Sequence, residues 1–318
     1  MQTRYRACNK LSSVVVLLFL ILMLLETGCV TSKKSLLALS KAQTTTPDLG
    51  EVKSEIRFQN YIFRVFYSDE TGGSFVIYHK NKPVVRETGV IGISGTAYRV
   101  ISPGEDPEPP PDVSPNIIDI TGDGIPDLVV ETFSGGAHCC YTYYLYSLGK
   151  KFKPIAVLET KDSSLRFQDL DGDSIYEILG RDYTFAYWQT YFADSPAPEV
   201  ILRHTGEGYH LALDLMRKSP PSEEELSKQI TDVRRQFGDP VMETFQDPAW
   251  RTARVPSSLW ETMLDLIYGG NSQVAWDFFS RAWPKNEKGE NEFLAAFKAK
   301  LQTSPYWADL KTTMPSPE

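Results

Sequence analysis

Alternating apolar and polar positions dominate the chain from residue 55 to about residue 215. The runs "YIFRVFYS" and "SFVIYHKNKPVVRE" are rich in aromatic and β-branched residues, as half-buried strands are. Turn sequences such as "DETGG" and "HKNKP" separate them. Further runs of this kind are "DLVVETF", "CYTYYLYSL", "KPIAVLET", "YEILGRD", "FAYWQTYF", "EVILRH" and "YHLALDL". The pattern predicts an all-β domain over residues 55–215.

Helical spacing replaces this alternation after "KSPPSEEE". Ser222 followed by Glu225 matches a capping box, which marks the start of a helix. Apolar residues recur at helical spacing in "EEELSKQITDVRRQF", "SSLWETMLDLIYGG", "SQVAWDFFSRAW" and "NEFLAAFKAKLQ". We therefore expect a small all-α C-terminal domain over residues 222–315.

Aromatic residues are concentrated in this helical region, where they could line a ligand groove or form the core. We favour the core, because they fall on the apolar faces of the predicted helices. They are Trp260, Trp276, Phe278, Phe279, Trp283, Phe293 and Phe297.

Residues 1–28 have the pattern of a secretory signal peptide. Two arginines and a lysine precede an apolar run over residues 11–25, which is shorter than the roughly 20 residues of a membrane-spanning helix. The sequence "LETGC" at its end resembles a bacterial lipobox. That resemblance implies cleavage before Cys29 and attachment of lipid to its thiol. An ordinary signal peptide followed by a chance cysteine is the alternative.

Residues 29–54 are rich in Ser, Thr and Lys and have weak periodicity, which is typical of a flexible tether. Together with a lipidated Cys29, such a tether would hold a folded body clear of a membrane surface. The sequence thus predicts a protein of the cell envelope, periplasmic or at the cell surface, that is anchored in the membrane by lipid.

Charge and motifs limit the function. The net charge of -8 and the lack of a basic stripe argue against nucleic-acid binding. No serine-hydrolase, zinc-protease, P-loop or dinucleotide motif is present. These features favour binding or structure over catalysis.

Cys139 and Cys140 are adjacent, which leaves two interpretations. In an oxidising compartment they could form a vicinal disulfide. Otherwise they are two small thiols on opposite faces of a strand. The neighbouring His138 suggests zinc, but two adjacent cysteines cannot easily both reach one tetrahedral ion, so we expect a structural turn.

Two acidic loops repeat the same spacing. The first, loop one (residues 119–127), has candidate ligands at its first, third, fifth and ninth positions. The second, loop two (residues 169–177), has them at the same positions 50 residues later, without a gap. The candidates are Asp119, Thr121, Asp123, Asp127, Asp169, Asp171, Asp173 and Glu177.

Alternate residues of a tightly curled loop can direct their side chains to one centre. Calcium takes about six to eight oxygen ligands, and glycine at the fourth position lets the backbone bend. An EF-hand would need glutamate at the twelfth position, where this chain has Val130 and Gly180. A pair of solvated Asp-Gly turns is the simpler alternative. By charge alone, loop two should bind calcium more tightly, since it has four carboxylates against three.

The pattern "D-x-[DT]-G-D-G-x-x-[DE]", followed by an apolar strand, resembles the FG-GAP or VCBS-type repeats of integrin-like β-propellers. The resemblance covers about residues 116–185 and implies calcium bound by both loops. It also implies a β-rich domain with propeller-like repeats. Ser174 stands where glycine is usual, and Glu177 is longer than the usual aspartate.

These features predict a calcium-binding, membrane-anchored envelope lipoprotein that acts as a binding module, with an envelope protein or a glycan as partner. An extracytoplasmic hydrolase acting on glycan or peptide is the alternative, with the acidic β face as its site. A purely structural envelope component is a third.

Overall fold

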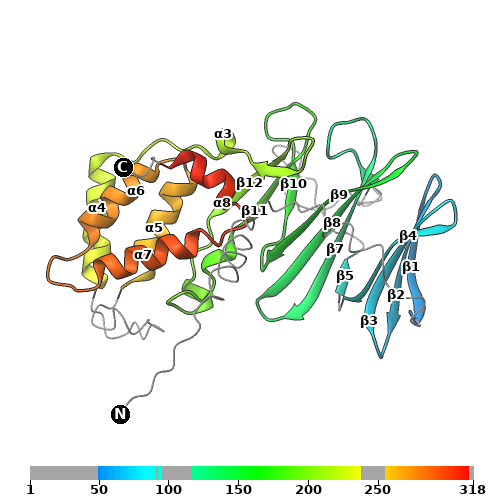
Figure 1. The fold of residues 1–318 in the computed structure, drawn as a ribbon, viewed down its shortest axis with the longest axis horizontal. Helices are drawn as coiled ribbons and strands as arrows, with labels where there is room; N and C mark the ends of the chain where they lie inside the picture. Colours follow the sequence, from blue (N-terminus) through cyan, green and yellow to red (C-terminus); the bar gives the residue numbers. More distant parts are fainter. Residues whose placement is uncertain (1–48, 91, 95–116, 238–254, 315–318) are drawn as a thin grey trace, which may run out of the picture. The chain divides into compact units, whose positions relative to one another are not determined.

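The computed structural model describes residues 49–90, 92–94, 117–237 and 255–314. They form three antiparallel sheets that are followed along the chain by helices (Figure 1). The predictions of a β-rich region and of C-terminal helices are confirmed. The predicted signal peptide and Cys29 lie outside the described residues, as does most of the tether. Its last residues are not tether, because strand β1 begins at Glu51.

The first sheet is a meander of four strands in the order β1-β2-β3-β4. The strands are β1 (Glu51–Phe58), β2 (Tyr61–Ser68), β3 (Gly72–His79) and β4 (Lys82–Val90). Strand β2 consists mostly of aromatic and β-branched residues, of which Tyr61, Phe63 and Phe66 are buried.

The second sheet has β7 (Asp127–Gly136), β8 (Cys139–Leu148) and β9 (Phe152–Lys161) in sequence order. Two short strands, β5 (Gly92–Ser94) and β6 (Ile117–Ile118), both pair with β7. Loop one connects β6 to β7, so the ninth residue of the loop is also the first residue of the strand.

The third sheet repeats this arrangement. Its strands are β10 (Arg166–Gln168), β11 (Glu177–Arg181), β12 (Glu199–His204) and β13 (Tyr209–Leu211), in that order. Loop two connects β10 to β11, just as loop one connects β6 to β7. The repeat seen in the sequence is therefore also a repeat of strand, loop and strand.

Side chains on opposite faces of the second sheet join two different cores. Leu128 and Val130 of β7 pack in a cluster with Phe75 of the first sheet. Val129, between them, packs in a cluster with Phe167 of the third sheet. This follows from the two-residue period of a strand. The apolar run that follows loop one is continuous because both faces of β7 are buried.

The prediction of a strand at "FAYWQTYF" is wrong. This segment runs from the last residue of one short 3-10 helix, η1 (Tyr183–Phe185), to the first residue of another, η2 (Phe192–Asp194). Tyr187 and Gln189 have φ angles of 57° and 59°, which are left-handed and incompatible with a strand. Trp188 packs instead on the aromatic core of the helices. We call residues 182–198 the aromatic loop.

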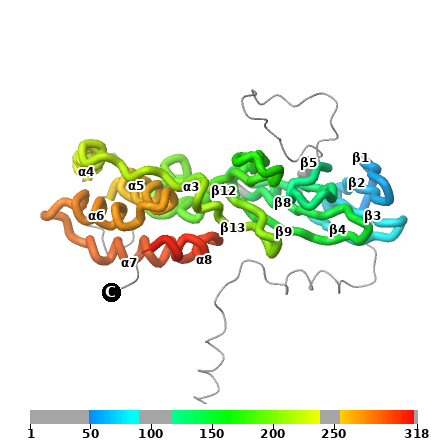
Figure 2. The backbone as a smooth tube through the Cα atoms, turned by 90° about the horizontal axis from the view of Figure 1, so that it is seen from above, coloured from blue at the N-terminus to red at the C-terminus, as the bar shows by residue number. Residues whose placement is uncertain are grey.

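The C-terminal region consists of helices, of which α4, α5, α6 and α7 lie together in Figure 2. The elements are α3 (Leu213–Met216), α4 (Glu223–Gln236), α5 (Ser257–Tyr268), α6 (Ser272–Ala282), α7 (Glu290–Leu301), α8 (Trp307–Leu310) and η4 (Lys311–Thr313). The predicted capping box is present, with Ser222 and Glu225 each bonding the other's backbone N–H. Among the described residues, no helix has both the length and the apolar character to cross a membrane.

The aromatic residues of the helices form a core, as predicted. Six of the seven are buried, and Trp276 is partly buried against the same cluster. The buried ones are Trp260, Phe278, Phe279, Trp283, Phe293 and Phe297. The cluster also contains Phe167 and Ile178 of the third sheet, so the helices and this sheet share one core.

Candidate metal centre in two matched acidic loops

The first and fifth positions of both loops are fixed by hydrogen bonds from the loop's own backbone. Asp119 accepts from the N–H groups of the fifth and sixth residues of loop one, at 3.2 and 2.7 Å. Asp169 accepts from the fourth and sixth residues of loop two, at 2.7 and 3.1 Å. Asp123 and Asp173 each accept from the N–H of the seventh residue, at 2.9 and 2.8 Å. Both loops are thus curled in the same way.

The ninth carboxylate of each loop is fully buried and faces back toward the loop. Asp127 and Glu177 accept hydrogen bonds from the N–H of the second residue, at 3.1 and 3.0 Å. In loop one the N–H and the hydroxyl of Thr121 also donate to Asp127, at 3.2 and 3.1 Å. The ninth residue therefore ties the start of each loop to the strand that follows.

The two loops lie side by side. The N–H of Tyr176 in loop two donates to the carbonyl oxygen of Ile120 in loop one, at 3.0 Å. A Cβ atom at Gly122 would lie 2.6 Å from Cγ1 of Ile175, and Gly122 has a φ of +68°. Glycine is needed there both for the left-handed backbone and for the close approach of the neighbouring loop.

Three of the four candidate carboxylates of loop two come together. One oxygen each from Asp169, Asp171 and Glu177 lie within 4.8 Å of one another, close enough for a shared metal ion. Asp173 is not part of this group. Within the described ranges this is the one such group of histidine, cysteine and acidic residues, so the carboxylates of loop one are not gathered in the same way.

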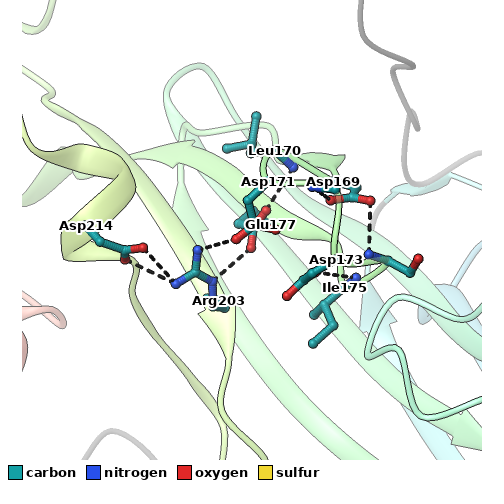
Figure 3. Close-up of polar contacts among 10 residues, drawn as sticks. Asp169, Leu170, Asp171, Asp173, Ile175, Glu177, Arg203 and Asp214 are labelled. Atoms are coloured by element: carbon teal, nitrogen blue, oxygen red, sulfur yellow. Dashed lines mark hydrogen bonds and ion pairs between the residues drawn. The ribbon is translucent and has the colours of Figure 1, made fainter.

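An arginine shares this acidic group (Figure 3). Arg203 on β12 bonds Glu177 through Nε at 3.1 Å and Asp171 through a terminal nitrogen at 2.8 Å. Its other terminal nitrogen bonds both oxygens of Asp214, at 3.1 Å. The guanidinium therefore supplies part of the positive charge that a metal would supply. Sequence reasoning missed Arg203, although its place on the strand after β11 is the signal that could have indicated it.

Loop one has no arginine in this position. The second carboxylate oxygen of Asp127, Oδ1, is buried and has no hydrogen-bond partner among the described residues. The residue opposite Asp127 on β8 is Ser147, and the one on β6 is Ile118. Burial raises the pKa of Asp127 to about 6, although the hydrogen bonds from Thr121 act to lower it. Loop one thus has a buried carboxylate whose charge is balanced only by hydrogen bonds.

The cysteine pair lies apart from these loops. Cys140 is in a disulfide. The side chain of Cys139 is outside what the structure describes, so a vicinal bond between the two stays a prediction. His138 lies in the turn between β7 and β8, where its ring stacks on Phe192 with centroids 3.8 Å apart. The expected structural turn is therefore present.

Comparison with known proteins adds little to this geometry. No family model matches the chain, and no solved structure matches it. The chain is similar to an uncharacterized protein, y4bJ, of Sinorhizobium fredii, with 31% identity over 83 residues. The match covers 26% of this chain and 13% of the length of that relative.

Proposed function

We propose that the chain is a calcium-stabilised binding module of the cell envelope, with propeller-like repeats and a lipid anchor at Cys29. The observation that carries the calcium proposal is the convergence of Asp169, Asp171 and Glu177 within 4.8 Å, in a loop whose hydrogen bonds are matched 50 residues earlier in the chain. Hard oxygen ligands of this kind suit calcium.

The two loops would use calcium differently. In loop two the ion would join Arg203 in neutralising a group of carboxylates that otherwise repel one another. In loop one the ion would give Oδ1 of Asp127 the positive partner that Glu177 has in Arg203. Asp119, Thr121 and Asp123 would supply the remaining side-chain ligands there, and Asp173 would be an additional ligand in loop two.

The arrangement of the sheets supports the propeller-like part of the proposal. The first and third sheets are antiparallel meanders, and so are strands β7, β8 and β9 of the second sheet. The second sheet packs against the first with one face and against the third with the other. Blades of a propeller stack in this way. A closed propeller needs at least four blades, and the described residues contain three sheets.

The geometry of the acidic loops gives less support to the alternative that the chain is a hydrolase. A glycosidase needs two carboxyl groups that face a substrate as acid and as base or nucleophile. Here Asp119, Asp169, Asp127 and Glu177 accept hydrogen bonds from backbone N–H groups, and Glu177 also bonds Arg203. These bonds are typical of a loop that holds itself in shape.

Thermal unfolding with calcium and with chelator tests the proposed function. At about 1 mM calcium and a dissociation constant near 0.1 mM, binding adds about 1.4 kcal/mol to stability. We expect a rise of roughly 2–4 °C in Tm over the chelated protein. Asp169→Asn should reduce this rise, while Glu224→Gln on the exposed face of α4 should keep it. Equal Tm values with and without calcium would contradict the proposal.

The anchor has its own test. We expect Cys29→Ser to move the chain from the membrane fraction to the soluble fraction when it is expressed in a bacterium that processes lipoproteins. Unchanged partitioning of the variant would exclude a lipid at this thiol.

A further inference from the structure

A cavity of about 380 Å³ lies beside the aromatic loop, away from the two acidic loops. Its size falls within the range of small-ligand sites, about 300–1,000 Å³. Tyr183 and Phe192 of the aromatic loop line one part of it, and Glu261 and Asp265 of α5 line another. Arg181, at the end of β11, contributes a guanidinium group. The lining thus combines aromatic rings with charged hydrogen-bonding groups.

Next to the cavity, the aromatic loop exposes tyrosine rings to solvent. Tyr187 and Tyr191 are 58% and 50% exposed, so two large rings of one short segment are open to solvent. The ring of Tyr187 lies 5.3 Å from that of Phe192, and Tyr183 stacks on Phe192 with an angle of 2° between the rings. Tyr187, Phe192 and Tyr183 therefore form a continuous group of rings, and the last two line the cavity.

The loop is held in this conformation from beneath. Trp188 packs among the buried rings of the helices, and Asp182 accepts hydrogen bonds from Tyr268 and Ser304 at 2.5 and 2.6 Å. Tyr187, next to Trp188, has a left-handed backbone, which is costly for a residue with a large side chain. Fixing exposed rings in a strained loop is typical of a binding site rather than of a simple connection.

The polar groups of the cavity limit what can bind there. Glu261 and Asp265 are one helical turn apart and exposed. Neither carboxylate makes a side-chain hydrogen bond or a close ion pair among the described residues, although the positive charges of Lys218 and Arg181 act on Asp265. The guanidinium of Arg181 donates one hydrogen bond, to the carbonyl oxygen of Ala197 at 3.0 Å, and keeps further N–H groups for a ligand. An acidic ligand would be repelled by the two carboxylates, and an apolar one would leave them without partners.

A sugar satisfies both kinds of surface. Its hydroxyl groups can donate to carboxylates and accept from a guanidinium, which gives charge-assisted hydrogen bonds. The C–H groups on the face of its ring can lie on the negative face of an aromatic ring. We propose that the aromatic loop and this cavity bind an uncharged oligosaccharide, with the tyrosines stacking on sugar rings outside the cavity and Glu261, Asp265 and Arg181 holding a ring inside it. This proposal rests on the binding role proposed above, but not on calcium.

Calorimetric titration of the full chain in detergent tests the proposal. The ligands are uncharged trisaccharides of hexose and of N-acetylhexosamine units, and each is titrated separately. We expect binding of at least one of them, with the dissociation constant raised at least tenfold by Tyr187→Ala and by Tyr191→Ala. Tyr67→Ala replaces another exposed tyrosine, 44% exposed, on the first sheet and should leave the constant unchanged. Asp265→Asn should also weaken binding, whereas Glu224→Gln should not.

Other outcomes would overturn the proposal. One is that no trisaccharide binds at millimolar concentration. Another is that a trisaccharide binds and that Tyr187→Ala and Tyr191→Ala leave its dissociation constant unchanged. Binding of a lysine-rich peptide in place of the sugars would also overturn it, because it would show that the carboxylates select a cation. Both tyrosines are exposed, so equal Tm values for variants and parent would exclude misfolding. Calcium titration of the same sample would show whether the acidic loops bind their ion when the sugars do not bind.

Discussion

At the scale of single residues, two glycines in equivalent positions of the acidic loops have different surroundings. Gly122 and Gly172 both have left-handed backbones, with φ angles of +68° and +78°. An added Cβ would clash with Ile175 at Gly122 but would meet no atom within 4 Å at Gly172. The pair therefore separates the cost of the backbone conformation from the cost of the contact between the loops.

We expect Gly172→Ala to lower the free energy of unfolding by about 1–2 kcal/mol, the cost of a left-handed alanine. Gly122→Ala should lower it by about 1–3 kcal/mol more, because the loops must move apart. Urea unfolding of both variants in chelator measures the difference. Equal losses for the two variants would show that the loops do not touch.

The buried carboxyl of Asp127 makes stability depend on pH. Burial raises its pKa to about 6, above the value of about 3.9 in an unfolded chain, so the folded state binds the proton more tightly. The unfolding free energy should therefore fall as pH rises from about 4 to about 6, by an amount on the order of 3 kcal/mol.

Urea unfolding at several pH values in chelator, for the parent and for Asp127→Asn, checks this prediction. The variant cannot ionise at this position and should lose that part of the pH dependence. A parallel decline in both proteins would assign the dependence to other groups.

At the scale of elements, strand β12 contributes a charge to a loop that belongs to β10 and β11. Arg203 bonds Asp171 and Glu177, and Glu177 is fully buried. When calcium is absent, the guanidinium of Arg203 stabilises the charged carboxylates. When calcium is present, the guanidinium competes with the ion for the same carboxylates. The number of carboxylates alone predicted that loop two binds calcium more tightly than loop one. Competition with Arg203 reduces this predicted advantage of loop two.

We expect Arg203→Gln to have opposite effects in chelator and in calcium. In chelator the variant should lose about 3 kcal/mol of stability, because a buried carboxylate loses its partner. The affinity of the variant for calcium should be about tenfold higher than that of the parent, because the ion no longer competes with a guanidinium for the carboxylates. Calorimetry and urea unfolding measure the two effects.

Arg166→Gln provides a matched control. Arg166 is also a strand arginine of the third sheet, but its contact with Glu199 is at 3.9 Å and both side chains are more than half exposed. Its loss should cost less than about 1 kcal/mol and leave calcium affinity unchanged. A calcium affinity of Arg203→Gln equal to that of the parent would show that the arginine and the ion do not share a site.

Local patterns explain which elements could be predicted. The capping box, the turn sequences and the spacing of the acidic loops all depend on neighbours within a few residues, and each predicted the observed local structure. Arg203 depends on a cross-strand partner 26 residues away, which no local pattern contains. The strand predicted at "FAYWQTYF" failed because two of its aromatic residues, Phe185 and Trp188, pack on helices that come later in the chain.

At the scale of the whole molecule, the third sheet and the helices behave as one packed body. They share a core, and the buried carboxylate of Asp182 accepts hydrogen bonds from Tyr268 and Ser304 of the helical region. The spacing of apolar residues indicated two separate domains, because it changes abruptly from the alternation of strands to the period of helices. It could not show that apolar faces on both sides of this change pack against each other.

We expect Tyr268→Phe to lower the free energy of unfolding by about 1–3 kcal/mol, because Asp182 loses a donor in a buried place. Sheet and helices should still unfold in one transition. Tyr67→Phe on the exposed face of β2 is the control and should change stability by less than about 0.5 kcal/mol. Far-UV circular dichroism and tryptophan fluorescence would follow the transition, and two separate transitions in the parent would contradict a shared core.

Calorimetric titration of the chelator-stripped chain with calcium tests the central claim most directly. The account predicts measurable heat of binding at millimolar calcium, with weaker binding in Asp169→Asn and unchanged binding in Glu224→Gln. No heat from the parent protein, or equal binding in Asp169→Asn, would contradict the claim that these acidic loops hold a divalent ion.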